Sequence, residues 1–351
     1  MVCAHPLSIA ARRVASEVLA PAAEVVDRMD LLPRSHLESL AAAGLMGLVA
    51  PVDQGGADAA GPVVRHVQRV VAGACGATFF TWVQHHAPVR YLASAPDSPA
   101  RRRWLPELAA GRAWGGVGFA YLRRPGAPVV RAEPCDGGWI FDGVAPWVTG
   151  WGLVDVIVVV AGAPDGSKVF AALTPDTAGL EATPLDLMVL GSTGTVRMML
   201  DGVRVGSDEL IDIWSADRWE AVDRDAAARP GGAPFGIAAT AIEHLTAMVP
   251  DVAGALRTEL ATLSADAEDL LGTVDPPDRS DWQAALTEVR DRSLSLAGRA
   301  TQAYVVAAGG RAMDRTHPAQ RLLREAAFHL IQAQTPMLRA QSLSRLSAAD
   351  R

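Results

Sequence analysis

The chain has 351 residues, of which 50% are hydrophobic and 20% charged, and its formal net charge is -7 at pH 7. This length suits two or three packed domains, and the acidic balance argues against the basic face that a nucleic-acid partner requires. Cys3, Cys75 and Cys135 share no metal-ligand spacing, and no apolar run reaches the roughly 18 residues of a membrane span. We therefore expect a cytoplasmic protein with reduced thiols, no metal site and no membrane partner.

Apolar residues at helical spacing dominate the N-terminal third of the chain. Pro21 interrupts the first helical pattern, which predicts either two short helices or one kinked helix. His85 and His86 are neighbours, so they point to different sides of their helix, and a structural role is favoured over metal binding. The predicted helices of this part are 7–29, 33–44, 63–74, 78–92 and 98–111.

The apolar period changes to alternation from Trp114 to Val205, and turn residues follow at short intervals. A block of strands between two helical blocks indicates a separate small β domain. The segment 191–194 is rich in Gly and Ser but precedes a strand, so it is predicted to form a turn and not a phosphate site. The candidate strands are 115–122, 128–132, 138–142, 154–161, 168–173 and 195–205.

Helical spacing returns after Ser215 and predicts four long antiparallel helices, which would form a bundle. Residues 224–234 are rich in Ala, Gly and Pro and are interpreted as a mobile connection before them. Pro336 lacks a backbone donor and disfavours helix at Thr335, so the last helix should break there. The four predicted helices are 236–248, 251–271, 281–308 and 318–346.

The stretch 137–152 is the richest in specific residues. Asp142-Gly143 is predicted as a tight turn between two antiparallel strands, because this pair supplies the positive φ angles such a turn needs. Trp147 follows, and two interpretations of its indole remain open: it packs in the core, or it faces a ligand.

These residues resemble the flavin-binding hairpin of the acyl-CoA dehydrogenase family. The match comprises Gly138-Trp139, Gly143 and Trp147-Val148-Thr149, in the order of the family pattern. Two other segments are similar to family signatures: 45–56, with its Gly-Leu and Gly-Gly pairs, and 101–111, with its Leu-Pro pair. The resemblance covers nearly the whole chain.

The resemblance implies a multidomain α+β fold, with an N-terminal α-helical domain (1–112), a middle β-barrel domain (113–215) and a C-terminal four-helix bundle (216–351). It also implies FAD as cofactor and a homodimer or homotetramer. Arg123 and Arg124 replace polar residues of the family's flavin loop, and they either pair with a phosphate or the flavin edge or are rim charges. The expected cofactor-binding residues are Leu122, Arg123, Trp147, Val148, Thr149, Gly310 and Thr335, with Arg124 expected to bind substrate.

The family's catalytic glutamate is missing. Its position is occupied by Ala333, which cannot carry a proton, and the catalytic residue is therefore unknown. Asp223 and Asp225 are the nearby acids and are the candidates for a base. The family's glutamine before the Gly309-Gly310 pair is also replaced, by Val306.

From the resemblance we expect a flavin-dependent oxidoreductase that acts on an acyl thioester, bound either to CoA or to a carrier protein. Two alternatives stay open because the glutamate is absent. One is a flavin-dependent monooxygenase on the same fold, which needs no base for the α-proton. The other is a non-redox protein of secondary metabolism that binds or cyclises a natural-product intermediate.

Overall fold

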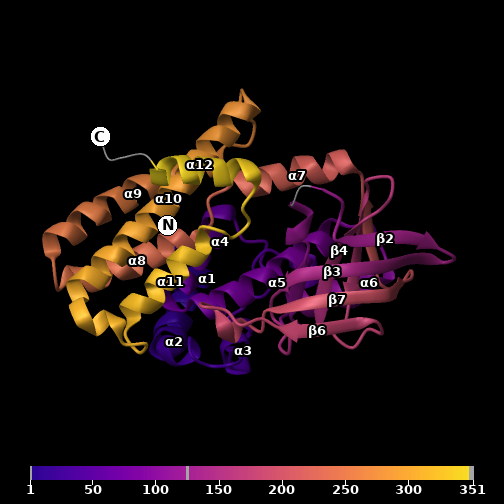
Figure 1. Ribbon diagram of the computed structural model, residues 1–351, viewed down its shortest axis with the longest axis horizontal. Coiled ribbons are helices and arrows are strands. Elements are labelled where there is room, and N and C mark those ends of the chain that lie inside the picture. Colours follow the sequence, from indigo (N-terminus) through magenta and orange to yellow (C-terminus); the bar gives the residue numbers. More distant parts are fainter. Residues whose placement is uncertain (1, 124–125, 348–351) are drawn as a thin grey trace.

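The computed structural model describes residues 2–123 and 126–347, and Figure 1 shows N-terminal helices, a middle sheet and C-terminal helices. The expected order of helical, sheet and helical blocks is confirmed. We propose domain boundaries after residues 112 and 215, both of which fall between elements. The N-terminal elements are η1 (Val2–Ala4), α1 (Pro6–Val14), η2 (Ala15–Leu19), α2 (Ala20–Val26), α3 (Arg34–Ala42), η3 (Val52–Gln54), α4 (Gly61–Ala74), α5 (Gly76–Ser94) and α6 (Pro99–Ala109).

The middle part forms one eight-stranded sheet with the order β6-β7-β3-β2-β4-β5-β8, from which β1 branches by pairing with β4. The strands are β1 (Gly115–Gly118), β2 (Val130–Cys135), β3 (Gly138–Val148), β4 (Val156–Gly162), β5 (Lys168–Leu173), β6 (Leu180–Pro184), β7 (Val196–Val205) and β8 (Leu210–Trp214). Two short helical turns, η4 (Ala120–Arg123) and η5 (Gly191–Thr193), lie between strands.

The C-terminal part begins with α7 (Ala216–Ala228), which lies beside the sheet and α12 in Figure 1. The bundle core is built from α8, α9, α10 and α11 around apolar side chains such as Leu245, Leu263 and Leu296. The other elements are α8 (Gly232–Thr246), α9 (Pro250–Gly272), α10 (Arg279–Ala308), η6 (Gly309–Met313), α11 (Pro318–His329) and α12 (Pro336–Ser347). No described helix is both long and apolar enough to cross a membrane.

Strand β4 is buried on both faces, as its continuous run of β-branched residues predicts. Ile157 and Val159 face the core shared with the N-terminal helices, whereas Val156 and Val158 face a second core beneath α5 and α6. Strands β6 and β8 were not predicted, because both end the sheet path and are only partly buried, so they lack a regular apolar alternation.

The turn expected at Asp142-Gly143 is wrong. Strand β3 runs through this pair, and the hairpin with β2 turns earlier, between Cys135 and Gly138. Gly143 has a φ of 133° and marks a β-bulge, where a Cβ would lie 2.0 Å from the Val129 carbonyl oxygen. The glycine therefore serves a bulge and close backbone approach instead of a turn.

Three expectations about the helical parts are also resolved. The chain remains helical from α1 to α2 through the π-helical turn η2, in which the Ala20 N–H bonds to the Ala15 carbonyl one turn ahead of Pro21. The connection expected at 224–234 is wrong at both ends, because residues up to Ala228 belong to α7 and residues from Gly232 belong to α8, which leaves 229–231 as the connection. The break before Pro336 is confirmed: α11 ends at His329 and α12 begins at Pro336.

The two neighbouring histidines are structural. His85 accepts from the Gly115 N–H through Nδ1 at 3.0 Å, and His86 donates from Nε2 to the Leu45 carbonyl at 3.3 Å. Both rings are buried, and among the described residues no group of three or more His, Cys, Asp or Glu side chains is placed to hold a metal ion. These bonds fix α5 to β1 and to the segment after α3.

Candidate functional site

A cavity of ≈ 1060 Å³ lies between the end of β3, α5, α11 and α12. Its wall is largely apolar and aromatic, with Phe80, Tyr121, Trp147 and Phe328 among the contributors. Arg123 and Arg339 are its charged lining side chains, and no described Asp, Glu or His lines it. This combination of an apolar wall with a few polar groups is typical of a small-molecule or cofactor site.

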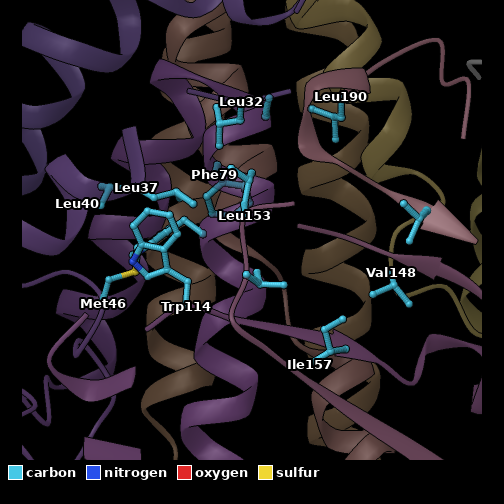
Figure 2. Packing of buried hydrophobic residues seen from close by; sticks show 14 of the residues in the cluster. Leu32, Leu37, Leu40, Met46, Phe79, Trp114, Val148, Leu153, Ile157 and Leu190 are labelled. Atoms are coloured by element: carbon cyan, nitrogen blue, oxygen red, sulfur yellow. The ribbon is translucent and has the colours of Figure 1, made fainter. Parts of the chain in front are cut away.

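The end of β3 places two predicted residues on the cavity wall. Residues alternate between faces along a strand, so Trp147 and Thr149 share a side while Val148 points to the other. Trp147 is 44% exposed and lines the cavity, whereas Val148 is fully buried in the sheet core. Figure 2 shows Val148 in that core together with Ile157. Of the two interpretations of the Trp147 indole, the geometry favours the ligand-facing one.

Thr149 and Thr335 reach the same cavity from different parts of the chain. Thr149 Oγ1 lies 2.9 Å from Thr195 Oγ1, which also lines the wall. Thr335 precedes α12, and its Oγ1 accepts from the Leu338 N–H at 3.3 Å, so its hydroxyl caps the helix. The break at Pro336 is thus the local feature that turns Thr335 toward the cavity.

Residues 330–335, between α11 and α12, form another wall, and Arg290 of α10 holds them. Its Nη2 donates to the Gln332 carbonyl at 2.8 Å and to the Ala333 carbonyl at 3.4 Å, while its Nη1 donates to the Ala227 carbonyl. Burial, and secondarily the positive charge of Arg123, lowers the pKa of Arg290 to about 10. Nothing in the local sequence around Arg290 indicates this role.

Two further residues shape this loop. His329 Nδ1 lies 2.7 Å from Gln332 Oε1, and burial lowers the pKa of His329 to about 4, so the ring is neutral at pH 7 and donates to the amide oxygen. Ala333 has a φ of 51°, in the left-handed region. The position predicted to correspond to the family's glutamate is therefore occupied by a small residue in an unfavourable backbone conformation.

The two candidate bases are engaged elsewhere. Asp223 forms a two-pronged ion pair with Arg123, whose Nε lies 3.0 Å from each carboxylate oxygen and whose Nη2 lies 2.7 Å from Oδ1. Asp225 pairs with Arg279 and accepts from Gln283 Nε2 at 2.5 Å. Neither carboxylate lines the large cavity.

The remaining predicted site residues lie outside the large cavity. Leu122 and Asp223 line a smaller neighbouring cavity of ≈ 350 Å³, which shares Arg123 and Thr335 with the large one. Gly310 is exposed in η6 and lines neither cavity. Arg124 lies outside the described residues. The structure therefore brings together Arg123, Trp147, Thr149 and Thr335, and their ligand roles stay predictions.

Known proteins share both the N-terminal sequence and the whole fold. Residues 6–112 match the family model described as the N-terminal domain of acyl-CoA dehydrogenase. The solved butyryl-CoA dehydrogenase from Megasphaera elsdenii superposes with a TM-score of 0.79 and 16% identity, covering 97% of each chain. Residues 6–112 are thus similar in sequence to the acyl-CoA dehydrogenase family, and the whole chain has the acyl-CoA dehydrogenase fold.

The proteins that this chain resembles differ in their named chemistry. A probable acyl-CoA dehydrogenase of Bacillus subtilis (strain 168) is 27% identical over 212 residues, which covers 56% of this chain and 54% of the relative. The chain spans about half the length of the curated relatives it matches. The dibenzothiophene monooxygenase from Paenibacillus sp. A11-2 superposes with a TM-score of 0.81 and 18% identity over 98% of this chain and 97% of that chain. The fold therefore does not by itself select the reaction.

Proposed function

We propose that this protein is a flavin-dependent oxidoreductase that acts on an acyl thioester. The observation that carries the proposal is the convergence of Trp147, Thr149 and Thr335 on one apolar-walled cavity of ≈ 1060 Å³. Such a volume lies at the upper end of the roughly 300–1,000 Å³ common for ligand sites, so a tricyclic ring and part of a substrate fit together. When bound, a flavin supplies a two-electron acceptor.

The side chains present suit a flavin ring. Trp147 offers a partly exposed aromatic face, and the two threonine hydroxyls offer hydrogen-bonding groups at separate points of the wall. Arg123 would contribute positive charge, although its ion pair with Asp223 reduces this. We propose FAD as the cofactor, with FMN as the alternative suggested by the FMN-bound structure of the Paenibacillus monooxygenase.

A monooxygenase function is the second candidate, and one observation favours it. Removal of an α-proton needs a general base within hydrogen-bond reach of the substrate. The described wall of the large cavity contains no carboxylate and no histidine, and Asp223 and Asp225 are both paired outside it. Oxygenation of a substrate by reduced flavin and O2 needs no such base.

Flavin content tests the proposal first. The purified protein should bind FAD or FMN with yellow absorbance, and Trp147→Ala should weaken this binding. Trp139→Ala is the matched control, because Trp139 belongs to the same strand but does not line the cavity. Protein that binds neither flavin would overturn both redox candidates and leave the binding or cyclising alternative.

Substrate reduction then separates the two redox candidates. Anaerobic bleaching of the bound flavin by acyl-CoA thioesters supports the dehydrogenase. Failure of every thioester tested, together with reduction by a partner reductase and oxygen uptake with substrate, supports the monooxygenase. Size-exclusion chromatography with light scattering tests the proposed homodimer or homotetramer, and a carrier-protein thioester compared with its CoA counterpart tests the proposed acyl carrier.

A further inference from the structure

Three threonine hydroxyls form a chain from the cavity wall to a buried carbonyl. Thr149 Oγ1 lies 2.9 Å from Thr195 Oγ1, which lies 2.7 Å from Thr193 Oγ1. Thr193 Oγ1 in turn donates to the Leu190 carbonyl oxygen at 2.7 Å. Thr149 and Thr195 line the cavity, whereas Thr193 is fully buried behind them.

The carbonyl at the inner end fixes the direction of every bond in this chain. A carbonyl can only accept, and each hydroxyl carries a single proton. Thr193 uses its proton on Leu190, so Thr195 must donate to Thr193, and Thr149 must donate to Thr195. The Thr149 oxygen therefore presents only its lone pairs to the cavity and acts there as an acceptor.

Thr335, at another point of the cavity wall, has the opposite polarity. Its Oγ1 accepts from the Leu338 N–H at 3.3 Å, and the described residues offer no acceptor for its own proton within hydrogen-bond distance. Its hydroxyl is therefore available to the cavity as a donor. A ligand that satisfies both walls carries an N–H or O–H toward Thr149 and an acceptor toward Thr335.

We propose that Thr193 and Thr195 are positioning residues that hold Thr149 as the acceptor for an N–H group of the bound flavin. This inference rests on the proposed function. A flavin ring has an N–H at N3 in both redox states, and two-electron reduction adds an N–H at N5 and, in the neutral reduced form, another at N1. The hydroxyl chain would thus favour either the N3 edge or the reduced ring.

Substitution within the chain tests the inference without removing Thr149. Thr195→Val leaves the Thr149 proton without an internal acceptor, so the hydroxyl can turn and donate into the cavity. Thr193→Val has the same consequence, because Thr195 can then donate to Thr149. Thr193 does not line the cavity, so its substitution can reach a ligand through the hydroxyl chain or through Leu190, whose carbonyl it bonds. Thr193→Ser keeps both bonds and is the control for the second route. Thr195→Ser retains the hydroxyl and is the conservative control.

The measurements are the flavin midpoint potential and the affinity ratio of FMN to 3-methyl-FMN, which lacks the N3 proton. Loss of one net hydrogen bond corresponds to a change of roughly 2- to 12-fold. In both valine variants, either the affinity ratio should change by that factor or the two-electron midpoint potential should shift by up to about 30 mV. The Thr195→Ser variant should match the wild type.

The outcomes separate this inference from the proposed function. Wild-type protein that binds no flavin overturns the proposed function itself. Wild-type protein that binds flavin, with both valine variants equal to it in potential and in the affinity ratio, overturns the hydroxyl chain alone. If Thr195→Val fails to fold, the more remote Thr193→Val, compared with Thr193→Ser, decides between the same two results.

Discussion

The Arg290 guanidinium on α10 donates to the backbone carbonyl of Gln332 at 2.8 Å and so fixes the loop that lines the cavity between α11 and α12. Arg290→Met would leave carbonyls of this loop without their partner. We expect a loss of about 1–3 kcal/mol in the free energy of unfolding, because removing one partner leaves buried polar groups unsatisfied. Flavin affinity should fall as well, since the loop carries Thr335. Urea unfolding and flavin titration measure the two effects.

The matched control for Arg290 lies on the same helix. Arg292→Met removes an exposed ion pair whose closest atoms are 3.8 Å apart, with Asp266 as partner. Exposed pairs contribute only about 0–1 kcal/mol, so this variant should resemble the wild type. Equal losses in the two variants would show that Arg290 does not clamp the loop.

Ala333→Gly should stabilise the protein. Ala333 has a φ of 51°, and a left-handed backbone costs an L-residue about 1–2 kcal/mol that glycine avoids. We expect a gain of about 1 kcal/mol in the free energy of unfolding, measured by urea denaturation. Ala327→Gly, inside α11, should instead lose about 0.5–1 kcal/mol. A destabilised Ala333→Gly variant would contradict the backbone argument.

Ala333→Glu places a carboxylate on the wall of the cavity, at the position predicted to correspond to the family's catalytic base. If the missing base limits dehydrogenation, anaerobic flavin bleaching by an acyl thioester should accelerate by about 10²–10⁴-fold, the range of general base catalysis. Ala333→Gln provides similar size without a proton acceptor and should leave the rate unchanged. Equal bleaching rates in the Glu and Gln variants would show that the missing base is not what limits dehydrogenation.

Asp223→Asn should act on stability more than on catalysis. The Arg123 and Asp223 side chains are 11% and 15% exposed, so loss of one charge leaves the other largely buried. We expect a loss of about 3 kcal/mol in the free energy of unfolding. The double variant with Arg123→Gln should lose less than the sum of the two single variants, because the two side chains interact. Stopped-flow flavin reduction should change by far less than the roughly 10²-fold expected of a general base. A larger rate loss would restore Asp223 as the base.

Stability should decline as the pH falls below neutrality because of buried histidines. Burial lowers the pKa of His85 and of His329 to about 4 from an ordinary value of 6.5. Above pH 6.5 the histidines are neutral in both the folded and the unfolded protein. Between pH 6.5 and about 4 they bind a proton only in the unfolded protein. The free energy of unfolding therefore falls through this window, by up to about 1.4 kcal/mol per pH unit for each histidine.

Urea denaturation at several pH values between 7 and about 4.5 checks the pH dependence. His329→Gln removes one titrating group and should make the decline shallower, and so should His85→Gln at a distant position. An unchanged slope in both variants would show that these rings are not responsible for it.

Local signals in the sequence were enough to predict much of the secondary structure and part of the cavity wall. Apolar periodicity predicted most helices and the inner strands, and Pro336 predicted the break between α11 and α12. The Trp147-Val148-Thr149 pattern led to the wall of the cavity, because strand alternation places its first and third residues on one face. Such features depend on neighbours within a few residues, and the sequence contains them directly.

Only the tertiary structure decided which chemistry surrounds the cavity. Arg123 pairs with Asp223 across 100 positions of the sequence, and Thr149 meets Thr195 across 46. Asp142-Gly143 was predicted to form a turn, but its pairing with β2 and β7 places it at a bulge within β3. These outcomes depend on contacts between distant segments, in which burial and partner geometry override local preference.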